Sequence, residues 1–421
     1  MSQISNNFTS AANTAGNLNG FFKETYADKL KDLIPDGVKI MNKIKFIARD
    51  KMPGNLYHAP VILGMEHGVT FGAPEDDAMN LNAPVSGNVK DATVRGNPMV
   101  LRSQLGYTAA SRAATSKGAF MDATKYLVSN MLRSLTKKLE IMMVYGQEGY
   151  GTVASVAGNV VTITTAEWAP GIWAGSEKMP IEIYDAASVA FPPAGVLKGA
   201  SEVVSIDMDL RTVTLQSAPV GLVAGDVIFH KGAYGKEFAG IRRILRQSAG
   251  TLFGINVAEF NLFRGNIYNV GATALSFPKL NLAASRAVEK GVDGDMFALI
   301  NVRAWANILN DQAALREYDV SYSKEKLEQG SKGIVFYSQN GKLEIEPSIY
   351  VKEGDAFLLS VDEWERVGSS DVTFEMPGNQ GQYIVSKQES TAYELRLWSE
   401  QALFCRAPGR NVYLTGIVNA T

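Results

Sequence analysis

The chain of 421 residues has a single cysteine, Cys405, so no disulfide bond can form within it. Such cysteine usage is typical of proteins in a reducing compartment. No run approaches the roughly 18 apolar residues of a membrane-spanning helix. The first residues lack a positively charged segment followed by an apolar run, so we expect no secretory signal. These absences predict a protein that is neither secreted nor membrane-embedded.

A surplus of basic residues is also missing, because 41 Lys and Arg face 43 Asp and Glu, a net charge of −2. A dedicated nucleic-acid-binding protein usually carries a clear positive surplus. We therefore expect no sequence-specific binding to DNA. The apolar content of 46% and charged content of 20% are typical of a folded chain.

The residues that most often carry catalysis are sparse. There are only three histidines, and neither an HExxH zinc motif nor a GxSxG nucleophile motif occurs. Glu66-His67 could begin a metal site, but no third ligand lies near it in sequence. Cys405 lies in an apolar, strand-like run, and we expect it to be buried. The sequence therefore predicts no catalytic, metal or cofactor-binding residue and no enzyme activity.

The strongest positive pattern is a long helix over residues 117–146. Its apolar residues recur every three or four positions, the spacing of one helix face, at Phe120, Ala123, Leu127, Met131, Leu135, Leu139 and Met142. Gly146 follows as a stop signal. Lys137 and Lys138 lie in the C-terminal half, where we expect the helix dipole to favour positive charge. The helix fits either a long core helix of an ordinary enzyme or the spine of a flat, extended subunit, and the flanking sequence has to decide between them.

Glycine and proline punctuate the segment before this helix, residues 51–116. Two apolar pieces, residues 59–63 and 99–105, have the texture of strands and bracket a polar middle. A structureless loop of this length is improbable in a compact domain. We predict an extended flap in which these two strands run out and back. A flap with little core of its own must bury its apolar side chains on another surface.

The N-terminal segment, residues 1–50, begins with a polar stretch that cannot fold alone. A short amphipathic helix follows, with Phe21, Phe22 and Tyr26 on its apolar face. Pro35 and Gly37 end it. We expect it to dock either on its own domain or on a neighbouring molecule.

After the long helix the chain is rich in strand signals, and the overall class is α+β. Residues 151–235 predict a small β-barrel-like insertion, with a hairpin turn at 207–209. Residues 238–247 fit either a strand or a short helix. Beyond them we predict helices over 276–290, with Ser276 as N-cap, and over 302–318. A buried strand is predicted at 297–300 and a hairpin turn at Asn340-Gly341. Further strands are expected at 372–374, 383–386, 393–398 and 412–415.

This order of parts resembles the major capsid protein of tailed bacteriophages. The likeness is carried by SQLGYTAASRAATSKGAF, TKYLVSNMLRSLTKKLEIMMVYGQ, AGIRRIL and YELRLWSEQALFCRAPGRNVYLTGI. The resemblance implies the capsid fold of that family. Its parts would be an N-arm at 1–50, an E-loop at 51–116, a P-domain spine helix at 117–150, a β-rich insertion at 151–235, a P-domain or linking segment at 236–280, an A-domain at 281–392 and C-terminal return strands at 393–421.

The resemblance also implies a function. The chain would form hexamers and pentamers of an icosahedral head, assembled in the host cytoplasm, that encloses double-stranded DNA. Scaffolding, portal and decoration proteins would be partners, with no cofactor and no membrane. The residues that we expect at contacts between subunits are Phe21, Phe22, Tyr26, Phe71, Lys90 and Arg95. Some relatives cross-link through an E-loop lysine, but we interpret Lys90 as a solvated or salt-bridging residue.

Three alternatives stay open at this point. A bacterial nanocompartment shell would share the fold and hold cargo proteins instead of DNA. A polysaccharide-acting enzyme with a β-rich accessory domain would show a pocket with two converging carboxylates. A tail or adhesion component would form trimers or rings instead of closed shells.

Overall fold

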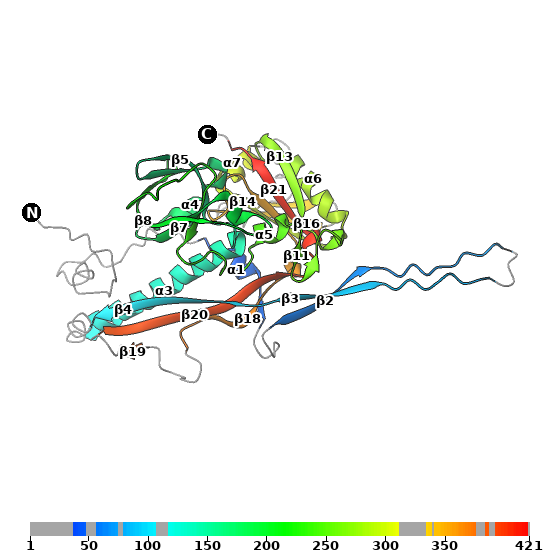
Figure 1. The fold of residues 1–421 in the computed structure, drawn as a ribbon, viewed down its shortest axis with the longest axis horizontal. Coiled ribbons are helices and arrows are strands. Elements are labelled where there is room, and N and C mark those ends of the chain that lie inside the picture. The colour runs from blue at the N-terminus through cyan, green and yellow to red at the C-terminus, as the bar shows by residue number, and fades with distance from the viewer. Residues whose placement is uncertain are drawn as a thin grey trace, which may run out of the picture.

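The computed structural model describes residues 37–47, 56–74, 79–106, 117–310, 334–338, 341–375, 384–386 and 392–419. The predicted amphipathic helix with Phe21, Phe22 and Tyr26 lies outside the described residues, as does the part of the chain after residue 310 that was expected to continue a helix to 318. Figure 1 shows a body built from sheets, a barrel and one long helix, from which a narrow two-stranded arm projects.

The long helix is confirmed as α3 (Lys117–Tyr145), 29 residues in length. Met131, Leu135 and Leu139 of the predicted stripe are buried. The helix ends at Gly146, whose N–H donates to the carbonyl of Met142 at 2.7 Å. A Cβ at Gly146 would lie 2.2 Å from the carbonyl oxygen of Phe238, so only glycine fits this close approach.

The expected role of Lys137 and Lys138 at the helix dipole is wrong. No basic residue occupies the last turn of α3. The ammonium of Lys137 donates instead to the carbonyl of Ala174 at 2.5 Å. Burial lowers the pKa of Lys137 to about 8 and that of Lys138 to about 7. Both side chains pack inward against the barrel, because the helix is covered on that side.

A five-stranded sheet lies along α3. Its central strand is β20 (Ala392–Cys405), which pairs antiparallel with both β18 (Trp364–Thr373) and β4 (Asn97–Gly106). The sheet is completed by β19 (Ile384–Ser386) and β1 (Phe46–Ile47). Cys405 is buried at the end of β20, as expected.

The projecting arm is the hairpin of β2 (Tyr57–Gly64) and β3 (Asn88–Val94). The predicted flap is therefore present, but its predicted second strand is wrong. Residues 99–105 belong to β4 and pair with β20, while β2 pairs with β3 from the polar middle. The apolar pattern favoured 99–105 because β3 buries only one side chain fully, that of Ala92.

A closed barrel lies on the opposite side of α3 from the sheet (Figure 1). Alternating buried residues such as Ile181 and Ile183 fill it, as expected for strands with one face inward. Its strands, in closing order, are β10 (Val227–His230), β5 (Gly151–Ala157), β6 (Val160–Ile163), β9 (Thr212–Leu215), β8 (Leu197–Asp207) and β7 (Pro180–Tyr184). The predicted hairpin is confirmed between β8 and β9.

The remaining lobe contains a six-stranded mixed sheet. The predicted buried strand is β14, whose six residues are all buried. The predicted hairpin is confirmed between β15 and β16, but Gly341 belongs to β16 and pairs with Ser338, and Asn340 lies outside the described residues. In spatial order the strands are β13 (Asn266–Thr273), β21 (Val412–Ile417), β17 (Ala356–Leu359), β14 (Met296–Asn301), β16 (Gly341–Ser348) and β15 (Ile334–Ser338).

Short helices complete this lobe and its junctions. The helix predicted from residue 276 is confirmed as α6 (Phe277–Val288), although the N-cap residue Ser276 makes no capping hydrogen bond with its side chain. Residues 238–247 contain a helix, α5, not a strand. The other short elements are α1 (Ile40–Lys43), α4 (Pro170–Trp173), α5 (Ile241–Arg246), α7 (Val302–Leu309), β11 (Thr251–Leu252) and β12 (Ile255–Asn256). Within the described ranges, no helix is long and apolar enough to cross a membrane.

Candidate functional site

The hairpin of β2 and β3 presents two chemically different faces. Pairing of Ala59 with Ala92 places both side chains on one face, where they are buried against the body. Ile62 pairs with Val89 on the other face, and these side chains are 76% and 59% exposed. The outer face thus offers an apolar cross-strand pair to solvent, a pair that normally gains its stability from burial.

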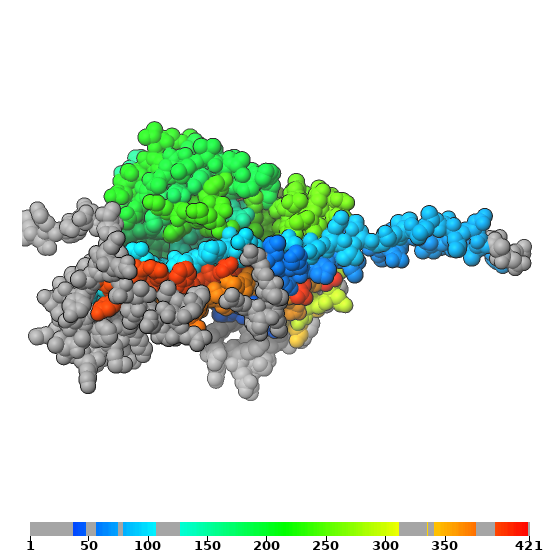
Figure 2. Space-filling view, turned by 60° about the horizontal axis from the view of Figure 1, so that its bottom comes forward, coloured from blue at the N-terminus to red at the C-terminus, as the bar shows by residue number. Residues whose placement is uncertain are grey.

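Apolar exposure continues along the hairpin beyond the paired strands. Figure 2 shows this arm standing clear of the body. Phe71 is 90% exposed and Leu81 82%. Among the described residues here, hydrogen bonds join the outgoing and returning stretches of the hairpin: the His67 N–H donates to the Val85 carbonyl at 3.1 Å, and Asn82 donates to the Thr70 hydroxyl and the Val69 carbonyl, each at 2.9 Å. Among the described residues between 56 and 89, from the start of β2 to the start of β3, nine large apolar residues are exposed: Leu56, Ile62, Met65, Val69, Phe71, Met79, Leu81, Val85 and Val89.

The structure places three of the predicted contact residues. Phe71 lies on the distal hairpin. Lys90 lies in β3, with its ammonium 5.8 Å from the centre of the Phe260 ring. Arg95 is exposed between β3 and β4. Phe71 fits a contact surface best, because Lys90 already has an aromatic neighbour within its own chain.

Two histidines lie on the hairpin: His58 in β2, and the exposed His67 of the pair that was considered as a metal site. His58 Nδ1 lies 2.6 Å from the carboxylate of Asp91, a diagonal contact on the outer face of the hairpin. Among the described residues, no cluster of three or more His, Cys, Asp or Glu side chains could hold a metal ion.

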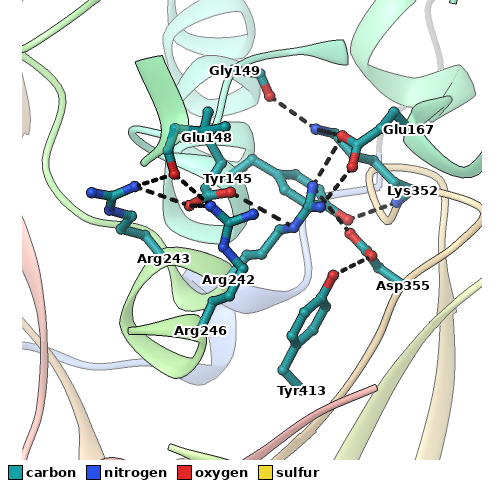
Figure 3. Close-up of polar contacts among 11 residues, drawn as sticks. Tyr145, Glu148, Gly149, Glu167, Arg242, Arg243, Arg246, Lys352, Asp355 and Tyr413 are labelled. Carbon is teal, nitrogen blue, oxygen red and sulfur yellow. Dashed lines mark hydrogen bonds and ion pairs between the residues drawn. The ribbon is translucent and has the colours of Figure 1, made fainter. Parts of the chain in front are cut away.

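A buried ionic cluster joins α3, the barrel and the lobe (Figure 3). Arg242 of α5 donates to both carboxylate oxygens of Glu167, at 3.0 and 2.6 Å. The completely buried ammonium of Lys352 donates to Glu167 at 2.6 Å. Asp355 lies 3.5 Å from Arg242 and accepts a hydrogen bond from the Tyr413 hydroxyl at 2.7 Å.

Burial and charge compete in this cluster. Burial alone would raise the pKa of Glu167, but the positive charges of Arg242 and Lys352 outweigh it and hold this pKa well below its usual range. Burial lowers the pKa of Lys352, and Glu167 opposes that shift. Each carboxylate is engaged by a cation or a hydroxyl inside the protein, so the cluster fastens segments together instead of offering a reactive group.

A second part of the cluster clamps the barrel onto α5. The Glu148 carboxylate, just past α3, lies 3.4 Å from Arg243 and 3.3 Å from Arg246. Both arginines also donate to the carbonyl of Val189 in the barrel, at 3.0 and 2.6 Å. The Phe191 ring centre lies 3.8 Å from the guanidinium of Arg243. The barrel is thereby fixed to the body by charge-assisted bonds.

None of these cluster residues was identified from the sequence alone. The one available signal was the run IRRILR, in which three arginines accompany apolar residues of a buried helix. Buried arginines require carboxylate partners. Nothing local in the sequence identifies Glu148 or Glu167 as those partners.

Solved structures of other proteins share the fold of this chain. Neither a family model nor a curated protein matches the sequence. A chain in the cyanophage A-1(L) capsid asymmetric unit matches with a TM-score of 0.55 and 12% identity, over 96% of this chain and 99% of that chain. The chain has a phage capsid fold. The predicted fold class is thereby confirmed over nearly the full length of both chains.

Two further structures align over similar lengths. A chain from Mycobacterium phage Bobi matches with a TM-score of 0.48 and 11% identity, over 96% of this chain and 99% of that one. A chain of the SrpI encapsulin complex from Synechococcus elongatus matches with a TM-score of 0.42 and 8% identity, over 98% and 99%.

Proposed function

We propose that this chain is the major capsid protein of a tailed bacteriophage, a structural subunit without enzyme activity. Copies would assemble into hexamers and pentamers of an icosahedral head that encloses double-stranded DNA. The capsid fold supports this proposal. The observation that carries it within the molecule is the projecting hairpin, whose apolar outer face has no covering among the described residues of its own chain.

The energetics of the hairpin favour a partner surface. A two-stranded hairpin is marginally stable by itself in water. Burying one Val, Leu, Ile, Met or Phe side chain is worth about 1.5–3 kcal/mol. Nine such side chains lie exposed on this segment. Transfer of even a few of them onto a neighbouring copy would therefore stabilise an assembled lattice strongly.

The other parts receive roles from the same proposal. The lobe of α6, α7 and the six-stranded sheet would meet its copies around the local symmetry axis, as the A-domain. The part of the N-terminal segment that precedes α1 would reach a neighbour as an N-arm, with Phe21, Phe22 and Tyr26 in contact, while α1 and β1 stay packed in the body of their own subunit. Separate scaffolding, portal and decoration proteins would take part in assembly. A net charge of −2 lets many copies pack without severe repulsion.

Negative-stain microscopy with size-exclusion chromatography tests this proposal. The protein would be expressed alone and together with its neighbouring genes. We expect closed icosahedral particles or capsomer-sized rings. A monomer or small dimer under every condition would overturn the proposal. Nuclease-resistant DNA inside particles would support a virus head, whereas shells that enclose only protein would instead support a nanocompartment.

Limited proteolysis gives an independent check of the hairpin. In the free subunit we expect cleavage within residues 65–87, which lie beyond the paired strands β2 and β3 and carry several exposed apolar side chains. In assembled particles the peptide bonds of residues 65–87 should resist the protease. Equal susceptibility in both states would show that the hairpin is not covered by a neighbour.

A further inference from the structure

A tight turn supports the hairpin where it leaves the body. Strands β11 and β12 pair at Thr251–Asn256 and Leu252–Ile255, with Phe253 and Gly254 between them. Leu252 and Ile255 are buried and hold this turn in the main core. Figure 1 shows β11 beside the root of β2 and β3.

Phe253 lies in a backbone conformation that phenylalanine disfavours. Its φ is 50° and that of Gly254 is 84°. Two successive positive φ angles in a two-residue hairpin turn favour Asn-Gly, because Asn tolerates the left-handed region and a larger side chain does not. Backbone strain of this kind persists only where the surroundings enforce it, and it is a reason to look for a function.

Phe253 contacts β20 through its ring and β3 of the hairpin through its backbone carbonyl. Its ring packs edge-on against Phe404 of β20, with centroids 5.0 Å apart. The ring of Tyr57, the first residue of β2, packs on the same Phe404 at 5.5 Å. The Phe253 carbonyl accepts the N–H of Thr93, at the end of β3, at 2.9 Å. The root of β3 is therefore fixed by the turn itself, and the root of β2 is fixed by the Phe404 ring on which Phe253 also packs.

A second hydrogen bond fixes the root of β2. The Tyr57 hydroxyl donates to the carboxylate of Glu365 in β18 at 3.1 Å. Tyr57 and Thr93 lie on opposite strands, in adjacent cross-strand pairs of the register. Two anchor points on two strands constrain the direction of a hairpin, whereas a single point would leave it free to pivot.

We propose that Phe253 is a positioning residue that sets the angle at which the hairpin leaves the body. This inference rests on the proposed shell function for its consequence: a fixed hairpin angle fixes the angle between neighbouring subunits and so the curvature of the shell. Phe253 would act through its contacts with Phe404 and Thr93.

The substitution Phe253→Asn separates this role from simple stabilisation. Asparagine suits the turn better than phenylalanine, so the backbone strain falls and the turn stays formed. The variant keeps the backbone carbonyl that accepts the Thr93 N–H but loses the ring, with its contact to Phe404 and its packing against the core. If the turn only stabilises the fold, the hairpin of the variant should keep one direction relative to the body. If Phe253 positions the hairpin, that direction should vary in the variant.

The first test measures distances in the free subunit. Spin labels would be attached to cysteines introduced at Ile62, on β2, and at Leu282, on α6; both positions are exposed, and the native Cys405 is buried. Double electron–electron resonance should give one narrow distance distribution in the otherwise wild-type protein and a distribution at least twice as wide with Phe253→Asn. Phe253→Tyr, which keeps the ring, should restore the narrow distribution.

An equally narrow, unshifted distribution with Phe253→Asn would overturn the positioning role. If the asparagine variant does not fold, Phe253→Gly provides the same test, because glycine also accepts the positive φ.

The second test measures particle diameters by electron microscopy. With wild-type shells of one size, Phe253→Asn should give a broader range of diameters. Unchanged diameters would overturn the link to curvature. A wild-type protein that forms no shell would contradict the proposed function, while the distance measurement would still decide the positioning role.

Discussion

Glu140 accepts a hydrogen bond from the backbone N–H of Ile40 at 2.9 Å, although the two residues are 100 positions apart. The same carboxylate accepts the N–H groups of Lys39 and Met41, each at 2.9 Å. It thereby satisfies the unpaired N–H groups at the start of α1. The N-terminal segment enters the body at this point and is held on the long helix α3.

Replacing this carboxylate should loosen the attachment. Glu140→Gln leaves one acceptor oxygen for three N–H donors and turns an NH₂ group toward them. We expect the free energy of unfolding to fall by about 2 kcal/mol, because buried charge-assisted hydrogen bonds are lost. Urea unfolding measures this change, with the exposed Glu259→Gln as the matched control. An equal effect of the two substitutions would contradict the anchoring role.

Two leucines of α3 allow a matched test of its buried face. Leu139 is 1% exposed and Leu132 is 38% exposed. Leu139→Ala should cost about 3 kcal/mol of unfolding free energy through lost burial and a cavity, whereas Leu132→Ala should cost less than about 1 kcal/mol. Denaturant titrations of both variants check the ranking. The reverse ranking would mean that α3 packs through another face.

Arg242 should be essential to the ionic cluster. Arg242→Met leaves the carboxylates of Glu167 and Asp355 buried without their main cation, so we expect a loss of about 3–5 kcal/mol. Arg102→Met is the control, since Arg102 is exposed and its ion pair with Glu394 is worth about 0–1 kcal/mol. Thermal and urea unfolding measure both variants. A loss no greater than that of the control would show that the cluster does not hold the body together.

We expect the free energy of unfolding to depend on pH through the buried carboxyl group of Glu237. Burial raises its pKa from 4.5 to about 7, although the N–H of Gln147 and the charge of Lys138 oppose this shift. The folded protein then holds this proton more tightly than the unfolded chain. The contribution of Glu237 to stability is therefore largest below pH 4.5 and is lost as the pH rises to about 7.

Glu237→Gln should remove the loss of stability at high pH, because glutamine is never charged and keeps an oxygen for the Gln147 N–H. At pH 8 we expect the variant to exceed the wild type by about 3 kcal/mol of unfolding free energy, and at pH 4.5 to match it. Urea unfolding at both pH values gives the comparison. An identical pH dependence in the two proteins would contradict the raised pKa.

The parts of the fold that were predictable depend on local patterns. The regular spacing of Leu127, Met131, Leu135 and Leu139 is enough to define α3, because a helix face is set by neighbouring turns. The Asn340-Gly341 dipeptide likewise predicted the hairpin of β15 and β16, although Gly341 itself belongs to β16. Such signals need no knowledge of distant parts of the chain.

The errors and omissions concern pairings between distant segments. Leu101 of β4 pairs with Leu397 of β20, almost 300 positions later, and a local apolar pattern cannot choose such a partner over a nearer strand. The ionic cluster was missed for a related reason. Charged residues such as Glu148, Arg242 and Lys352 are expected at the surface, and only the tertiary fold brings them together in the interior.

The central claim is that the exposed apolar residues of the hairpin hold neighbouring copies together, and sedimentation velocity tests it most directly. The comparison uses wild type, Phe71→Asp and, as control, Val220→Asp, which alters a barrel residue that is 95% exposed. All three should unfold with free energies within about 0.5 kcal/mol of one another, since both sites are solvent-exposed. We predict large assemblies from wild type and Val220→Asp, and free subunits or capsomers from Phe71→Asp. Assemblies of wild-type size and yield from Phe71→Asp would contradict the claim.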